Sequence, residues 1–181
     1  MPERILTASQ SGDNPYNVGN GAVVELEAAR IAGLSEAQNK AEHVFREIVP
    51  RDLLRPAATE RNVNDAVFSL ANELFGISMY WHKRIVRTGV NTLESYDENP
   101  PNLTIGNDDI LFLDLGPVFE NWEADFGRTF VLGGDPLKHK LRHDVGAAFA
   151  EGKQYFKDRP EITRADSTRS CSQFERSYAG S

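Results

Sequence analysis

Apolar residues recur at helical spacing in the first half of the chain. Over residues 34–48 they alternate with charged and amide side chains and predict an amphipathic helix, and residues 22–31 predict a shorter helix before it. A further helix is expected from Thr59, a good N-cap, to Gly76, a natural C-cap. The two longer helices, joined by a short loop that contains prolines, predict a helical hairpin.

Short runs rich in β-branched and apolar residues follow and predict strands. These runs are residues 84–88, 109–115 and 128–132. The run 109–115 is almost continuously apolar, which is typical of a strand buried on both faces. Residues 94–102 are polar and contain two adjacent prolines, so they predict an irregular loop. After the last run, Asp135 is expected to cap a third helix.

The two ends of the chain lack these patterns. Residues 1–21 are rich in Ser, Asn, Gly and Pro and are expected to form a loosely ordered arm. After Pro160 the helical periodicity is lost, and residues 164–181 predict an irregular tail. The sequence therefore predicts one structured domain over residues 22–163.

Composition and charge narrow the classes of function. The chain has 181 residues, of which 40% are hydrophobic and 26% charged, and its net charge of −7 argues against a general nucleic-acid-binding protein. No apolar run approaches the roughly 20 residues of a membrane span, and the start lacks a signal-peptide pattern. The single cysteine, Cys171, excludes an internal disulfide and favours a cytoplasmic location. Lys83, Arg84 and Arg87 form a small basic cluster, which is expected to be a solvated strand end rather than an anion site.

Two aspartates eleven residues apart carry the strongest chemical signal. Asp114 lies within an apolar strand, where a carboxylate is costly to bury without a partner. If a hairpin places Asp114 directly opposite Asp125, the turn falls near Phe119-Glu120 and the two carboxylates repel each other. One or two divalent cations would turn that repulsion into coordination. The plainer alternative is that one aspartate ends a strand and the other caps a turn, and two aspartates alone do not complete a metal site.

These residues also resemble a known family. Asp109 to Gly116, followed by Asp-Phe-Gly-Arg-Thr-Phe-Val at residues 125–131, is similar to the pita-bread metallopeptidases. That family includes methionine aminopeptidase, aminopeptidase P, Xaa-Pro dipeptidase and creatinase. Its pattern is a hydrophobic strand ending in Asp-Leu-Gly, with Asp-x-x-Arg-Thr-Phe beginning eleven residues after the first aspartate. The resemblance spans residues 34–160.

The resemblance implies a fold, a metal centre and a reaction. The fold is α/β, with helices that cover one face of a mainly antiparallel, curved sheet. Asp114 and Asp125 are the first two ligands of a centre that holds two divalent ions, such as Mn, Co or Zn. The reaction is hydrolysis of a peptide bond near a free N-terminus, often in Xaa-Pro peptides, by a metal-bound hydroxide. The implied partner is a peptide substrate, without nucleic acid or membrane, and a homodimer is compatible with it.

The sequence departs from the family pattern in several places. The family's further His and Glu ligands and its general-base Glu lie in a second half, and this sequence ends before such a half could fit. We therefore expect a C-terminally truncated member, which leaves the family's sequence near Arg164 and carries only part of the site, and no catalytic residue is assigned. His139 and His143 are expected on a solvated helix face. The family's substrate-contacting His is absent from its usual loop, and His82 is expected to be a structural or surface residue.

Two other functions stay open. One is a non-catalytic binding module of the same fold, and the other is a creatinase-like hydrolase of a small amidino compound. Intact Asp114 and Asp125 argue against the module, because relatives of that kind usually lose the ligands. The residues that would decide the amidino hydrolase lie in the half that this sequence lacks.

Overall fold

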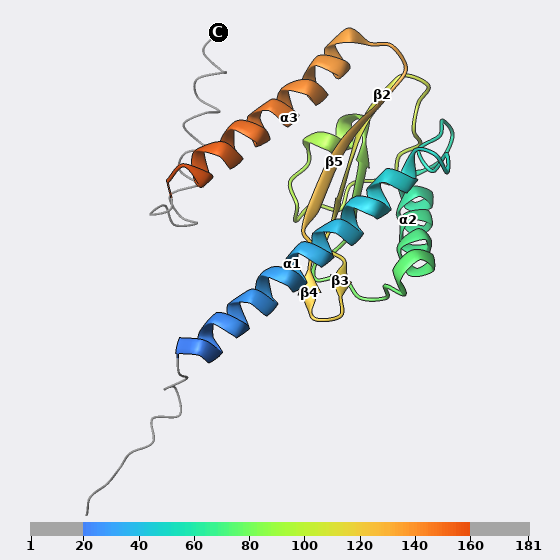
Figure 1. Cartoon of the computed structure of the whole chain (residues 1–181). Helices are drawn as coiled ribbons and strands as arrows, with labels where there is room; N and C mark the ends of the chain where they lie inside the picture. Colours follow the sequence, from blue (N-terminus) through green and yellow to red (C-terminus); the bar gives the residue numbers. More distant parts are fainter. Residues whose placement is uncertain (1–19, 160–181) are drawn as a thin grey trace, which may run out of the picture.

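The computed structural model describes residues 20–159 as helices packed on an antiparallel sheet (Figure 1). Its elements are α1 (Asn20–Ile48), α2 (Glu60–Phe75), β1 (Ile85–Thr88), the 3₁₀ helix η1 (Gly89–Leu93), β2 (Asp109–Leu115), β3 (Val118–Phe119), β4 (Trp122–Glu123), β5 (Phe126–Leu132) and α3 (Pro136–Lys157). The expected tail lies outside the described residues, as does the expected arm apart from its last two residues, which begin α1. None of the helices in residues 20–159 is both long enough and apolar enough to cross a membrane.

The first helix is continuous, and the break expected near residue 33 is wrong. Gly33 lies inside α1, and a Cβ at this position would be 2.2 Å from Nε1 of Trp122. The glycine therefore lets the helix backbone pass directly against the indole. A glycine inside a helix costs roughly 1 kcal/mol relative to alanine. The close contact with Trp122 explains why Gly33 is nevertheless found within α1.

The second helix has the two ends that the sequence predicts. The Thr59 hydroxyl accepts a hydrogen bond from the Asn62 backbone N–H at 3.2 Å, and the Asn62 side chain accepts one from the Thr59 N–H at 3.1 Å. Gly76 ends the helix in the left-handed conformation, with φ 68°. Both caps are local devices, which is why they could be predicted.

The three longer strands form an antiparallel sheet in the order β1-β2-β5. Leu111, Leu113 and Leu115 of β2 are completely or almost completely buried in the same core as α1 and α2. The alternate residues of β2, including Asp114, are only half-buried on the opposite face. Burial of β2 on both faces is therefore wrong, because α1 and α2 cover a single face.

The first residue of α2 has a role that the sequence did not reveal. Glu60 is 7% exposed, and its carboxylate accepts hydrogen bonds from the Thr88 N–H at 2.8 Å and the Leu103 N–H at 3.1 Å. The Asn91 side-chain amide donates to both of its oxygens at 3.0 Å. Glu60 thus joins α2 to β1, η1 and the segment that leads into β2.

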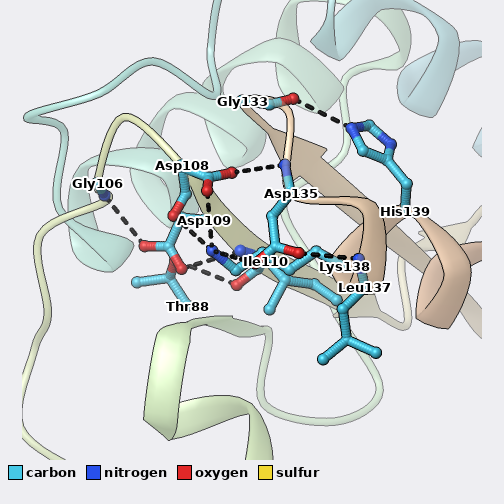
Figure 2. Close-up of polar contacts among 10 residues, drawn as sticks. All are labelled: Thr88, Gly106, Asp108, Asp109, Ile110, Gly133, Asp135, Leu137, Lys138 and His139. Carbon is cyan, nitrogen blue, oxygen red and sulfur yellow. Dashed lines mark hydrogen bonds and ion pairs between the residues drawn. The ribbon is translucent and has the colours of Figure 1, made fainter.

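The third helix extends from the end of β5 away from the sheet (Figure 1). As predicted, Asp135 caps it and accepts a hydrogen bond from the Leu137 N–H at 2.8 Å (Figure 2). None of its residues is buried, and the apolar side chains Leu137, Val145 and Phe149 are more than half exposed. The helix is therefore held by its N-terminal end and contributes nothing to the buried core of residues 20–159.

Candidate metal centre

Asp114 and Asp125 lie on the same face of the sheet, although their pairing differs from the prediction. Asp114 pairs with Gly127, not with Asp125. The hairpin turn lies at Glu120-Asn121, between the paired residues Phe119 and Trp122. This is one residue later than the predicted turn, and moving the turn by one residue shifts the pairing of the two strands by two residues. Because side chains alternate along a strand, a shift of two residues keeps Asp125 on the face of Asp114, as its diagonal neighbour.

A histidine joins the two aspartates from a segment 32 residues earlier in the chain. The Trp81 N–H donates to the Gly116 carbonyl at 2.9 Å, so the segment before β1 runs alongside the end of β2. His82 Nε2 consequently lies 3.9 Å from Oδ1 of Asp114 and 3.6 Å from Oδ1 of Asp125. A Cβ on Gly116 would be 2.7 Å from the imidazole, so the absent side chain leaves room for the ring.

His82, Asp114 and Asp125 each offer one ligand atom, and these atoms lie within 4.8 Å of one another. The sequence by itself predicts a structural or surface role for His82 and does not place it in this group. No local signal marks it, because only the pairing of the segment before β1 with the end of β2 brings the imidazole to the carboxylates. Nothing in the residues next to His82 specifies that pairing.

The other two histidines considered from the sequence do not join this group. His139 Nε2 lies 3.0 Å from the Gly133 carbonyl, at the start of α3 (Figure 2). His143 is exposed and lies beside Asp144. Within residues 20–159, the three-ligand group is formed by His82 and the two aspartates alone.

The electrostatics of the group favour a bound cation. Burial raises the pKa of Asp114; His82 opposes this rise, and the charge of Asp125 adds to it. Burial by itself lowers the pKa of His82, but the hydrogen bond to the Lys83 carbonyl and the charges of Asp114 and Asp125 outweigh it and raise the pKa. No group in residues 20–159 other than His82 forms a hydrogen bond or ion pair with either aspartate. Two carboxylates and an imidazole, held close without other donors, are a ligand set that fits a divalent metal ion.

The group opens into a cavity of about 640 Å³, lined by Trp81, His82, Tyr96, Asp114, Glu123 and Asp125. Trp81 is 76% exposed and Tyr96 is 47% exposed. The Tyr96 ring meets the His82 ring edge to face, with centroids 6.1 Å apart. The cavity therefore combines an acidic floor with two aromatic rings that a ligand can reach.

Arg87 holds the loop that carries Tyr96. Its side chain is buried, and its guanidinium donates to the carbonyls of Glu94 and Glu98, the latter at 3.0 Å. The expectation that this arginine belongs to a solvated strand end is wrong. The loop of residues 94–102 is irregular, as predicted, and side chains rather than a neighbouring strand bond its carbonyls at Glu94, Glu98 and Pro101.

Comparisons with known proteins identify a family and a shared fold. Residues 32–167 match metallopeptidase family M24 (Peptidase_M24). No curated protein matches the sequence.

Solved structures share the fold. A prolidase from Thermococcus sibiricus has a TM-score of 0.57 at 20% identity and covers 69% of this chain and 32% of its own. An X-Pro aminopeptidase from Thermotoga maritima MSB8 has a TM-score of 0.57 at 18% identity, and the match covers 75% of this chain and 38% of the aminopeptidase. A prolidase from Pyrococcus horikoshii OT3 has a TM-score of 0.56 at 15% identity, and the match covers 77% of this chain and 45% of that prolidase.

The expected fold class, a partial pita-bread fold with helices on a mainly antiparallel sheet, is confirmed. The chain spans less than half the length of each of these structures.

Proposed function

Because the chain belongs to metallopeptidase family M24, we propose that it acts on peptides with a free N-terminus, including Xaa-Pro peptides, in a reaction that depends on a divalent metal. The observation that carries the proposal is the three-ligand group of His82, Asp114 and Asp125. The names of the similar structures, prolidases and an X-Pro aminopeptidase, support the choice of peptide. A cytoplasmic location, supported by the single cysteine, completes the proposal.

In this proposal the described residues supply part of the metal site. Asp114 and Asp125 provide carboxylate oxygens and His82 provides an imidazole nitrogen, a set compatible with Mn, Co or Zn. A bound ion supplies Lewis acidity for hydrolysis. Asp125 is the more exposed carboxylate, with 75% of its side-chain surface accessible against 34% for Asp114, so it is the better placed to share a second ion. The group of His82, Asp114 and Asp125 offers three ligand atoms, so a centre with two ions needs further ligands.

The remaining side chains of the cavity favour the N-terminal end of a peptide. Glu123 lines the cavity together with both aspartates, so its lining is strongly acidic. An acidic cavity attracts a protonated amine. Trp81 and Tyr96 offer apolar surface to the first side chain of the peptide. These residues bind and orient the substrate, and none of them is assigned a proton-transfer role.

Metal binding is the first experiment. Isothermal titration with Mn²⁺ is expected to show binding to the wild-type chain and at least about a tenfold loss of affinity in Asp114→Asn and in Asp125→Asn, since each variant removes an anionic ligand. Asp158→Asn, at the end of α3, is the matched control and should bind like the wild type. Equal affinity in all four proteins would refute the proposed site.

Hydrolysis is the second measurement. The Mn²⁺-loaded chain is incubated with an Xaa-Pro dipeptide, and release of proline is followed for the wild type and Asp114→Asn. Release of proline by the wild type but not by Asp114→Asn supports the proposed peptidase activity. Metal binding without turnover by this chain limits it to a partial site. Absence of both favours the non-catalytic binding module.

A further inference from the structure

A second cavity adjoins the metal centre. It has a volume of about 700 Å³, and it shares Trp81 and His82 with the acidic cavity. Its lining includes the three cations Arg61, Lys83 and Arg84. Trp81 and His82 thus line both the cavity with the carboxylates and the cavity with the cationic side chains.

These cations have no carboxylate partner. None of the three forms an ion pair within residues 20–159, although acidic residues outnumber basic ones in the whole chain, 27 to 20. Glu60 is the acidic residue that lines this cavity, but the donors of Thr88, Asn91 and Leu103 already occupy its oxygens. The lining therefore carries three positive charges against the single negative charge of Glu60, whose oxygens are already hydrogen-bonded.

Arg84 is held rigidly in this lining. Its Nε donates to Oδ1 of Asn64 at 3.1 Å, and its guanidinium carbon lies 4.8 Å from the ring centroids of both Phe68 and Tyr80. The other guanidinium N–H groups of Arg84 have no hydrogen-bond partner in the described part of the chain. A guanidinium held in one position suits the binding of a carboxylate, because the arginine side chain loses little conformational entropy when the carboxylate binds.

Lys83 and Arg61 add charge from two directions. The Lys83 ammonium donates to the Glu98 carbonyl at 3.2 Å and lies 4.7 Å from the Tyr96 ring centroid, so it is anchored beside the loop that borders the metal centre. Arg61 is exposed on the first turn of α2, and the structure gives its side chain no partner within residues 20–159. Arg87, the remaining member of the basic cluster in the sequence, is used by the loop and does not line this cavity.

We propose that Arg61, Lys83 and Arg84 form a carboxylate-binding subsite for a peptide whose N-terminus lies in the acidic cavity. The placement of the N-terminus rests on the proposed function, but the subsite itself requires no metal. The carboxylate is either the C-terminus of a short peptide or an acidic side chain of a longer one. The subsite therefore selects for a negative charge one or a few residues after the N-terminus of the peptide.

The test uses the fluorescence of Trp81 in the metal-free full chain, with EDTA present. Trp122→Phe removes the other tryptophan of the chain and makes Trp81 the reporter. Three peptides are titrated: triglycine, triglycine amide and Gly-Glu-Gly amide. At least one carboxylate-bearing peptide should bind about tenfold tighter than triglycine amide, and which one binds identifies the source of the carboxylate.

Variants show whether the cations cause the preference. Arg61→Met and Lys83→Met, both at exposed positions, should each remove most of it, whereas Lys153→Met on α3 should retain it. Equal binding of all three peptides, no binding of any, or a preference that survives both variants would overturn the subsite. Mn²⁺ titration of the same preparations separates the two proposals: peptide selectivity without Mn²⁺ binding refutes the metal site alone, and the reverse refutes the subsite alone.

Discussion

Glu60, at the start of α2, and Asp114, on the central strand β2, are carboxylates beside the same small sheet, and the fold treats them in opposite ways. Glu60 is almost completely buried, and backbone and amide donors from three segments approach its two oxygens. Asp114 is half-buried; its neighbours are the carboxylate of Asp125 and the imidazole of His82, 3.9 Å away. Burial alone therefore does not tell a structural carboxylate from a functional one.

The difference lies in what the surrounding residues provide. Glu60 has its acceptor capacity filled, so it stabilises the joint between α2 and the sheet and is not available to a ligand. Asp114 and Asp125 lie close together, and His82 is their one polar partner within residues 20–159. A bound cation would remove the repulsion between the two carboxylates. Unsatisfied carboxylates on an open face of a sheet are thus the better indication of a binding site.

The largest expected effect is at Glu60. Glu60→Ala should lower the free energy of unfolding by about 3–5 kcal/mol, since several buried donors lose their acceptor at once. Urea denaturation followed by circular dichroism measures the loss. Glu73→Ala is the control: it removes an exposed carboxylate that pairs with Arg51 and should cost about 1 kcal/mol or less. Similar losses in the two variants would contradict the structural role of Glu60.

A smaller effect is expected at Gly116, where the backbone makes room for His82. In Gly116→Ala the new Cβ would lie 2.7 Å from the imidazole and 3.0 Å from the Glu123 carboxylate. The side chains must move, which should cost about 1–3 kcal/mol of stability and weaken Mn²⁺ binding about tenfold. Calorimetry with and without Mn²⁺ measures both effects. Gly134→Ala, whose Cβ would meet no atom within 4 Å, should change neither.

The smallest effect is expected at Asp114 in the metal-free protein. Because burial raises its pKa, the folded state holds the proton of Asp114 more tightly than the unfolded state does. Stability should therefore decrease as the pH rises from the ordinary carboxyl pKa through the raised value. Asp114→Asn lacks this decrease. Its free energy of unfolding should therefore equal or exceed that of the wild type at pH 7, and any such advantage should disappear below pH 3.8. Urea midpoints measured with EDTA across this range check the sign, and a variant less stable than the wild type at pH 7 would show that Asp114 stabilises the fold.

Features that depend on neighbouring residues could be predicted from the sequence. The caps at Thr59, Gly76 and Asp135 are made by side chains or backbone angles within three residues of the helix end. The strand of residues 109–115 and the shared face of the two aspartates follow from alternation. The division of the first helix at Gly33 failed because its reason, the indole of Trp122, lies 89 residues further along the chain.

By itself, the sequence determined the order of helices and strands and the presence of two aspartates in one hairpin, because periodicity and spacing encode these features locally. The motifs around the two aspartates also resembled the family that the comparisons then showed. Tertiary structure alone decided that His82 joins the aspartates, that Glu60 becomes a structural acceptor and that Arg87 turns inward while Lys83 and Arg84 line a cavity. Each of these outcomes depends on segments that are distant in sequence and are brought together by burial of the core. A side chain acquires its role from the donors and charges that this packing places around it.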